Sequence, residues 1–396
     1  MIREADRLNH VQEYYFSTKL REVRAMVAQG HPVINMGIGS PDLAPAPEVL
    51  QMLQEATSHA GAHQYQSYQG LPELRQTIAA FYENKFGVHL EADTEVLPLM
   101  GSKEGIMHIS MAFLNPGDRV LIPNPGYPTY ASVTRLVGAE PLFYELTEAG
   151  GWFPDLDALE ASGLDGVKLM WVSYPHMPTG ACATREQLAA LVSFARRNNI
   201  LLVNDNPYSF VLSREPLSIL GAAGAGGHVL ELNSLSKTFN MAGWRVGMVL
   251  GAAPLIASVL KVKSNMDSGM FYGIQKGAIA ALKSGPKWFE KLDEVYRNRR
   301  KAVFALADLL GCSYDPGAVG MFVWARLPEG SADAETYIDA LLREKHIFIA
   351  PGTIFGSAGA GYVRFSLCVP EEKIREAIRR LTVDKPAQKP EQNTEA

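Results

Sequence analysis

The chain has 396 residues, of which 47% are hydrophobic and 20% are charged. This length and composition are typical of a globular protein with a substantial core, built as two domains or as one large domain with an appendage. The 37 basic and 42 acidic residues give a formal net charge of −5, which argues against a nucleic acid or an anionic membrane surface as the main partner.

The amino-terminal segment, residues 1–30, is predicted to be a charged amphipathic helix. It is too polar for a signal peptide, and no run of about 18 apolar residues occurs anywhere in the chain. The three cysteines lie far apart and lack CxxC spacing: Cys182, Cys312 and Cys368. These features favour a cytoplasmic protein in a reducing compartment, without a disulfide framework.

A short strand ending in a Gly/Pro turn is predicted within residues 31–42. His59 and His63 follow at a spacing of four, which would place both on one helix face. Gly61 lies between them and no acidic or thiol partner is nearby, so we expect no metal site there.

From about residue 95 onward, apolar strands alternate with helical segments. The clearest helix covers residues 184–199, and Thr184 with Gln187 has the spacing of a capping box. Strands are predicted over residues 96–100, 119–122, 167–173, 200–204, 229–232 and 246–250. Such alternation indicates a mostly parallel sheet covered on both faces, in which ligands bind at the carboxyl ends of the strands.

Two turns after the first predicted strands offer candidate ligand contacts. Gly101 permits a tight turn and Ser102 begins an apolar-periodic helix, whose free N–H groups and dipole suit a phosphate, although many proteins of this class start helices this way. In "PNPGYPTY", the prolines and Gly126 hold Tyr127 in a stiff turn. Tyr127 either stacks on a flat ring or packs the turn.

An acidic residue and a basic segment follow two later strands. Asp205 comes at the end of an apolar strand, where an unpaired carboxylate is costly and requires a cation or proton donor, and Tyr208 follows it. The segment "NSLSKTFNMAGWRVG" (233–247) combines two hydroxyls, a lysine and an arginine. Its lysine, Lys237, is expected to have a lowered pKa among other cations and away from water, which suits imine chemistry.

These features together fit one ligand, pyridoxal phosphate, a flat, basic, phosphorylated ring that carries an aldehyde. Asp205 would keep the ring nitrogen protonated, Tyr208 would donate to the ring oxygen, and Tyr127 would lie on the ring face. The hydroxyls of Ser234 and Ser236, with Arg245, would hold the phosphate dianion. The glycine-rich stretch at 221–227 precedes a strand rather than a helix, so it does not have the order of a dinucleotide-binding loop.

"SLSKTFNMAGWRVG" resembles the lysine signature of the fold type I pyridoxal-phosphate enzymes, specifically the class I/II aminotransferases, and the resemblance covers about residues 33–380. It implies an α/β fold with a large domain, whose mostly parallel seven-stranded sheet is covered by helices, and a smaller α+β domain built from both chain ends. The implied bounds are 1–45 for an N-terminal segment of the small domain, 46–285 for the large cofactor-binding domain, 286–383 for the small domain, and 384–396 for a disordered tail.

The resemblance also implies roles for individual residues. Lys237 is similar to the lysine that joins the cofactor aldehyde, Asp205 to the partner of the pyridinium nitrogen, and Tyr208 to the donor to the ring oxygen. Tyr127 resembles the stacking aromatic. The phosphate-binding positions correspond to Ser102, Lys103 (through its backbone), Ser234, Ser236 and Arg245.

Three further positions concern the substrate and a second subunit. Gly39 in "GIGSPD" resembles the loop over the substrate, and Arg364 in "VRFSL" resembles the arginine that holds the substrate α-carboxylate in bidentate fashion. Tyr65 in "YQSYQGLPELR" resembles a tyrosine that reaches into the neighbouring subunit's site, which implies a homodimer.

One position departs from the family pattern. Met177 in "SYPHMPTG" stands where the family usually has the asparagine that donates to the ring oxygen. Methionine cannot donate, so a hydrogen bond worth about 1.5–3 kcal/mol is lost and the pKa of the cofactor imine should rise. His176 is a candidate to compensate.

The resemblance implies an aminotransferase that moves an amino group from an L-amino acid to 2-oxoglutarate or pyruvate in two half-reactions. "GSKEG" and "NPGYP" resemble the branch containing aspartate, alanine, methionine and LL-diaminopimelate aminotransferases. A lyase or decarboxylase on the same fold is the alternative. A ligand-sensing regulator would need a DNA-binding domain, and only about 30 residues precede the first predicted strand. An NAD-dependent dehydrogenase would need a GxGxxG turn, which is missing.

Overall fold

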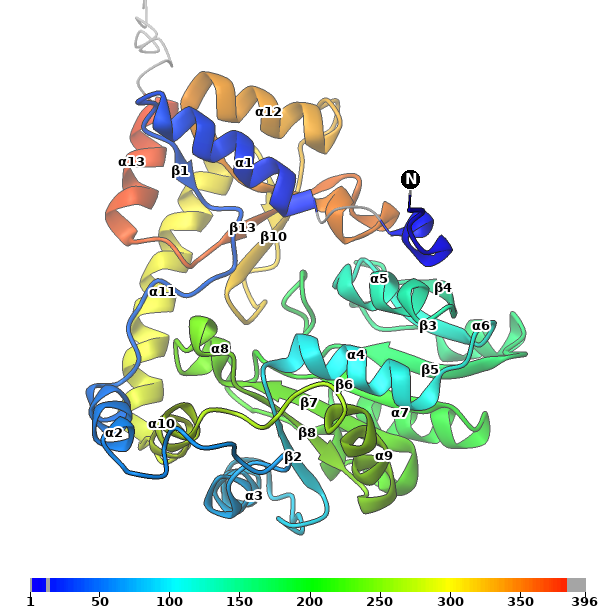
Figure 1. Cartoon of the computed structure of the whole chain (residues 1–396). Helices are drawn as coiled ribbons and strands as arrows, with labels where there is room; N and C mark the ends of the chain where they lie inside the picture. Colours follow the sequence, from blue (N-terminus) through cyan, green and yellow to red (C-terminus); the bar gives the residue numbers. More distant parts are fainter. Residues whose placement is uncertain (1, 12–14, 383–396) are drawn as a thin grey trace, which may run out of the picture.

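The computed structural model describes residues 2–11 and 15–382, so the predicted tail at 384–396 lies outside the described residues. A seven-stranded sheet with the order β2-β8-β7-β6-β5-β3-β4 forms the centre of the larger lobe (Figure 1). Its strands are β2 (Val96–Leu99), β3 (Arg119–Asn124), β4 (Glu140–Glu145), β5 (Val167–Val172), β6 (Leu201–Asp205), β7 (Val229–Ser234) and β8 (Gly247–Gly251).

Strand β8 is antiparallel to both of its neighbours, β2 and β7, whereas the other neighbouring strands are parallel. The prediction of a mostly parallel seven-stranded sheet is therefore confirmed. All six strands predicted from the sequence are present, and β4 is an additional strand at the edge.

The central strands β5 and β6 are mostly apolar because successive side chains enter two different cores. In β5, Leu169 and Trp171 pack on one face, and Met170 and Val172 pack on the other. The first face is covered by α4 (Ser102–Phe113), α5 (Thr129–Leu136) and α9 (Ala253–Lys263). The second is covered by α2 (Pro47–Thr57), α3 (Pro72–Phe86), α7 (Arg185–Arg197) and α10 (Tyr272–Leu282), and the Thr184–Gln187 capping box is present at the start of α7.

A smaller lobe joins segments from both ends of the chain (Figure 1). Strand β1 (Ile34–Asn35) pairs with β11 (Ile347–Phe348), and β10 (Phe322–Arg326) pairs antiparallel with β13 (Tyr362–Ser366). Strands β12 (Ala350–Pro351) and β9 (Ser313–Tyr314) complete the second sheet. The helices are α1 (Tyr15–Ala28), α11 (Pro286–Leu309), α12 (Ala334–Lys345) and α13 (Glu371–Thr382).

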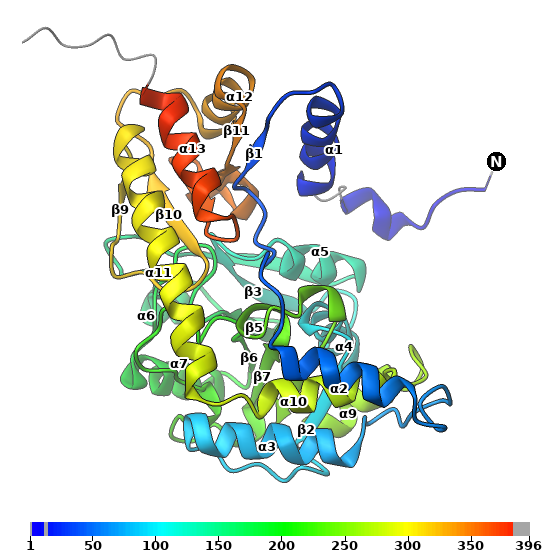
Figure 2. The ribbon, with the colours of Figure 1, turned by 90° about the vertical axis from the view of Figure 1, so that its left-hand side faces the viewer.

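Helix α11 runs from the smaller lobe down to α10 and α3 beside the large sheet, as Figure 2 shows. The lobes thus share one long helix, and the domain bounds inferred from the family resemblance stay a prediction. The amino terminus is not the single helix predicted over 1–30. A 3-10 helix covers Asp6–His10, and Val11 then adopts an extended conformation with φ −120° and ψ 114°.

Short elements complete the fold: α6 (Leu156–Ala161), α8 (Leu235–Thr238), and 3-10 helices at Ile219–Gly221, Gly226–His228, Ala242–Trp244, Gly352–Phe355 and Ser357–Gly359. No helix within residues 2–11 and 15–382 combines the length and the apolar character needed to cross a membrane.

Candidate active site

The predicted strand-end residues gather at one edge of the large sheet. Because β8 runs opposite to its neighbours, its first residue, Gly247, lies at the same edge as the carboxyl end of β7, where Ser234 is paired with it. Two adjoining cavities of about 450 and 410 Å³ open at this edge. The residues that line both are Tyr127, Met177, Tyr208, Lys237 and Ala242.

The larger cavity has a cationic, hydroxyl-rich end. It is lined by all five residues predicted to bind a phosphate: Ser102, Lys103, Ser234, Ser236 and Arg245. A Cβ on Gly101, whose φ is +94°, would collide with the Arg245 guanidinium, and one on Gly247 would lie 2.7 Å from the Ser102 nitrogen. These glycines let the arginine approach the first turn of α4, where free N–H groups favour a dianion.

The serines of this end are held in place by the short helix α8. The Ser234 hydroxyl accepts a hydrogen bond from the Ser236 backbone at 3.1 Å, and the two hydroxyl oxygens are 2.8 Å apart. Arg245 has a left-handed backbone with φ 57°, which is costly for a non-glycine residue and is found most often at functional sites.

Asp205 provides the clearest test of whether a basic ring fits the cavity. Its Oδ2 accepts a hydrogen bond from the Tyr130 hydroxyl at 2.9 Å, while its buried Oδ1 has no hydrogen-bond partner among the described residues. Burial raises the pKa of the Asp205 carboxyl to about 6, against the lowering effects of Tyr130 and Lys237. A protonated ring nitrogen would satisfy this oxygen, so the residues present fit pyridoxal phosphate.

Lys237 lies in α8 between the two cavities. Its Nζ donates a hydrogen bond to the Gly39 carbonyl oxygen at 2.5 Å. Burial lowers the pKa of the Lys237 ammonium, and Arg364 and Arg245 lower it further, whereas Cys368 and Asp205 raise it. The sequence-based expectation of a lowered Lys237 pKa has the same direction, although burial lowers the pKa more than the neighbouring cations do.

Arg364 in β13 lies at the far end of the smaller cavity, paired across the sheet with Trp324. Its guanidinium carbon lies 3.8 Å from the ring centre of Phe322 and 4.5 Å from that of Phe355. One nitrogen donates to the Gly37 carbonyl oxygen at 2.9 Å. A Cβ on Gly39 would collide with the Phe322 ring, so this loop approaches the site closely because it has glycine there.

Two tyrosines stand between the cavities. Burial raises the pKa of Tyr208 well above its ordinary value and also raises that of Tyr127, so both hydroxyls stay protonated and able to donate. Tyr208 packs edge-on against Phe322, with 5.8 Å between ring centres. The structure brings both tyrosines to the face of the cavity that contains Lys237.

Tyr65 is the one predicted cofactor residue that lines neither cavity in a single chain. Its side chain is 91% exposed, within a loop that contacts the segment before α10. His59 stacks on Tyr272 with ring centres 5.3 Å apart, and His63 stacks on Phe271 at 6.1 Å. The two histidines therefore pack against aromatic rings, while the tyrosine of the same loop is open to a partner.

Met177 and His176 differ in their access to the cavities. Met177 lines both, and its sulfur lies 3.3 Å from an Arg364 guanidinium nitrogen. His176 lines neither; it is buried, and its Nδ1 lies 2.8 Å from the Thr179 hydroxyl. Burial lowers the pKa of His176 to about 3, which keeps the ring neutral. The geometry gives no support to compensation by His176.

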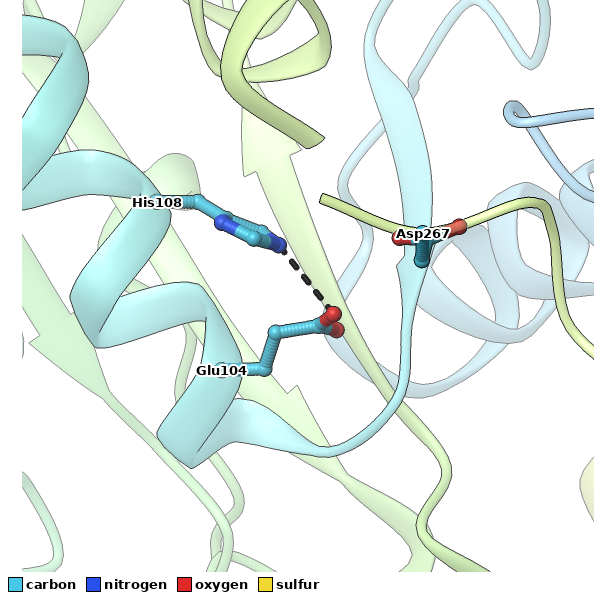
Figure 3. Close-up of side chains that lie close together, drawn as sticks. All are labelled: Glu104, His108 and Asp267. Carbon is cyan, nitrogen blue, oxygen red and sulfur yellow. Dashed lines mark ion pairs between the residues drawn. The ribbon is translucent and has the colours of Figure 1, made fainter. Parts of the chain in front are cut away.

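A titratable cluster beside the phosphate end was missed from the sequence (Figure 3). Glu104 and His108, one turn apart on α4, form a 3.1 Å ion pair, and Asp267 lies beside them, with the three ligand atoms within 4.8 Å of one another. Lys263 lies 2.8 and 2.9 Å from the two Asp267 oxygens and is almost fully buried. A metal ion would be repelled by this ammonium, so we interpret the group as an ion-pair cluster.

Comparisons with known proteins agree with this architecture. The family model described as aminotransferase class I and II matches residues 31–381. LL-diaminopimelate aminotransferases from Nitratidesulfovibrio vulgaris (strain Miyazaki F) and Aquifex aeolicus are 39% and 38% identical to the chain, covering 95% and 96% of it and 98% and 99% of their own lengths.

Solved structures are similar over the same extent. Substrate-bound BacF from Bacillus subtilis superposes with a TM-score of 0.92 at 35% identity, covering 98% of this chain and 100% of that one. N-succinyldiaminopimelate aminotransferase from Mycobacterium tuberculosis has a TM-score of 0.89 at 28% identity, covering 96% of this chain and 100% of that one.

Proposed function

The chain belongs to the class I and II aminotransferases, which depend on pyridoxal phosphate, and from this membership we propose that Lys237 is the lysine through which it moves an amino group from an L-amino acid to a 2-oxo acid. The acceptor is 2-oxoglutarate or pyruvate. One observation carries the assignment: the Lys237 amine, with its lowered pKa, lies between the phosphate-binding end and Arg364.

Pyridoxal phosphate supplies an aldehyde that joins an amine and a ring that withdraws electrons from the substrate α-carbon. Asp205 would keep the ring nitrogen protonated, because its Oδ2 accepts from Tyr130 while its buried Oδ1 has no hydrogen-bond partner among the described residues. Ser234, Ser236 and Arg245 would hold the phosphate. Tyr127 would lie against the ring face and Tyr208 would donate to the ring oxygen.

The substrate is oriented from the opposite side. Arg364 binds the α-carboxylate with its guanidinium, which the two phenylalanine rings and the Gly37 carbonyl oxygen hold in one orientation. Lys237 would accept the α-proton at its Nζ and hold it for return during the transfer, since a lowered pKa leaves more of its amine unprotonated. Water would supply the keto oxygen of the released 2-oxo acid, and the amino group would stay with the cofactor.

A single-turnover experiment tests this proposal. Protein loaded with pyridoxal phosphate is mixed with an amino acid, without acceptor, and the absorbance change from the aldehyde to the amine form is recorded with the yield of 2-oxo acid. We expect one 2-oxo acid for each cofactor converted, and no conversion in Lys237→Ala. Lys283→Ala, on the surface, is the matched control. Release of carbon dioxide, or of ammonia without the amine form, would contradict transamination.

LL-diaminopimelate is a second candidate donor, because relatives 38–40% identical over nearly the whole chain carry that substrate in their names. The same single-turnover experiment with this donor tests it. Rapid formation of the amine form, compared with other donors, would favour it.

A homodimer completes the proposed site. The loop that carries Tyr65 exposes this residue and, in part, Tyr68, and the neighbouring segment exposes Met266 and Phe271. An apolar surface of this kind suits a second copy of the chain, whose site would receive Tyr65.

A further inference from the structure

The smaller cavity, next to Lys237, has walls that suit an uncharged substrate. Its apolar lining includes Leu20 of α1, Ile38 of the loop after β1, and the ring of Phe322, which also contacts Arg364. Phe355 and Met177 form the part next to Arg364. Among the described residues that line this cavity, Lys237 and Arg364 are the only cations, and no carboxylate contributes to its wall.

Both of these cations already have a function in the proposed reaction. Lys237 handles the α-proton, and Arg364 binds the α-carboxylate. Arg364 is also fixed by the rings on its two faces and by the Gly37 carbonyl oxygen, so it is not available to a second, distal carboxylate. A charged distal group in this cavity would lose its water and would gain at most hydroxyl contacts such as that of Ser40, with no unassigned opposite charge, which costs several kcal/mol.

In the proposed homodimer, the loop at residues 58–70 would carry Tyr65 towards the neighbouring site, and residues 264–272 lie beside this loop. Neither segment contains a lysine or an arginine. The nearest lysine in sequence, Lys263, is buried in its ion pair with Asp267. The loop that carries Tyr65 would therefore bring no lysine or arginine to the cavity, and its other ionisable side chains besides the tyrosines are His59 and His63.

The amino-terminal wall of the cavity is held firmly in place. Lys19, next to Leu20, lies 2.6 Å from Asp339 of α12 and 2.7 Å from Glu22. Val23 is buried in the core of the smaller lobe. Because α1 is tied to that lobe, Leu20 forms a fixed apolar surface over the site.

Resting on the function proposed above, we propose that the donor is an amino acid with an uncharged apolar side chain, aromatic or long and aliphatic. Donors with a distal carboxylate or ammonium, including the diaminopimelate named for the relatives, are then poor substrates. The acceptor binds in the same cavity. Pyruvate, which has no distal carboxylate, is therefore favoured over 2-oxoglutarate.

Three donors with six-carbon chains separate charge from size, and LL-diaminopimelate adds one carbon with a distal ammonium and carboxylate. The rate constant for cofactor conversion, divided by the half-saturating concentration, is measured for L-norleucine, L-lysine, L-2-aminoadipate and LL-diaminopimelate. We expect L-norleucine to exceed each charged donor by at least about 100-fold, the ratio expected when a charge is buried unpaired. Similar values for L-2-aminoadipate or LL-diaminopimelate would overturn this inference and leave transamination intact. Conversion by none of these donors and not by L-phenylalanine either would remove the proposed function and this inference with it.

Binding without turnover gives an independent measurement. Hexanoate and hexanedioate each offer Arg364 one carboxylate, and only hexanedioate carries a second charge. We expect hexanoate to bind the cofactor-loaded protein at least about tenfold more tightly. Equal or tighter binding of hexanedioate would overturn the inference.

A paired substitution on α1 tests the wall itself. Leu20→Arg places a cation in the cavity and should raise the specificity ratio of L-2-aminoadipate over L-norleucine by about tenfold or more. Val27→Arg, on an exposed part of the same helix, should leave the ratio unchanged. An unchanged ratio in folded, cofactor-binding Leu20→Arg would count against Leu20 as part of the donor site.

Discussion

At the scale of single residues, the site depends on charged groups that are only partly neutralised within the chain. Asp205 has one buried oxygen bonded to Tyr130 and another without a partner among the described residues. Lys237 is buried deeply enough that its pKa falls. Both groups destabilise the fold of the cofactor-free chain. In the cofactor-loaded protein, Asp205 would pair with the cationic ring and Lys237 would join the aldehyde.

Asp205 should make the stability of the cofactor-free chain depend on pH. Its carboxyl pKa is raised from 3.8 to about 6, so the folded state is favoured while the group is protonated, and this advantage is lost as pH rises through about 6. Cofactor-free Asp205→Asn should therefore be more stable than the natural chain at pH 8, by about 2–3 kcal/mol, and similar to it at pH 4. Urea unfolding across this range measures the difference.

The cofactor-loaded proteins provide the control for this prediction. With pyridoxal phosphate bound, the natural chain should be more stable to urea than Asp205→Asn. The asparagine side chain of the variant offers no negative charge to the ring nitrogen. Equal stabilities of the two cofactor-free proteins at every pH would show that the ionised Asp205 carboxylate does not destabilise the fold.

Met177 gives a second prediction at this scale. Met177→Asn adds a donor beside the cofactor, at a position that lines both cavities. A hydrogen bond worth about 1.5–3 kcal/mol should lower the pH midpoint of the bound cofactor's absorbance change by about 1–2 units. His176→Ala should leave that midpoint in place, since His176 does not line the cavities. A spectral titration reads both, and an unshifted midpoint in Met177→Asn contradicts the prediction.

At the scale of helices and strands, the parallel part of the sheet was the most predictable feature. Central strands such as β5 and β7 are almost entirely buried, and each carries a cluster of apolar residues, Leu169–Val172 in β5 and Val229–Leu230 with Leu232 in β7. Strand β4 was missed because it is an edge strand whose residues, "EPLFYE", are largely exposed. Proline and glutamate are tolerated there since one side has no neighbouring strand.

The ion-pair cluster could be found only in part from sequence. Glu104 and His108 at a spacing of four on a predicted helix are a usable signal. Asp267 lies more than 150 residues further on, and only the packing of α9 against α4 brings it to them. Strands β10 and β13 pair although α12 and two short strands lie between them in the chain.

The Lys263–Asp267 pair should stabilise the connection that follows α9. Asp267→Asn leaves a buried ammonium without its carboxylate, which should reduce the free energy of unfolding by about 3–5 kcal/mol. Adding Lys263→Met to that variant should recover most of the loss, because the unpaired charge is then removed. Urea unfolding measures both, with exposed Lys261→Met as control; a loss below about 1 kcal/mol in Asp267→Asn would contradict a buried pair.

At the scale of the whole molecule, one chain does not contain every predicted residue in its own site. Tyr65 is 91% exposed and lines neither cavity. A sequence resemblance suggested this arrangement, and a single chain has no partner that would test it. The homodimer, the bounds of the two domains and the cytoplasmic location therefore stay predictions.

Mixing two inactive variants tests the dimer. Tyr65→Ala and Lys237→Ala should each lose most activity. The first variant retains Lys237, and the second retains Tyr65. If Tyr65 acts in the neighbouring site, mixed dimers contain one intact site, and refolding an equal mixture should restore about a quarter of the natural activity. Mixed dimers with no more activity than the sum of the variants would place Tyr65 outside the neighbouring site, and a stable monomer in gel filtration would remove the dimer.

The covalent attachment point of the cofactor is the most direct test of the whole account. Protein loaded with pyridoxal phosphate is reduced with borohydride, digested, and the modified peptide is identified by mass. The account predicts a single modified residue, Lys237, in a protein that absorbs visible light before reduction. A modification on Lys103 or another lysine, or a protein that stays colourless after incubation with the cofactor, would contradict it.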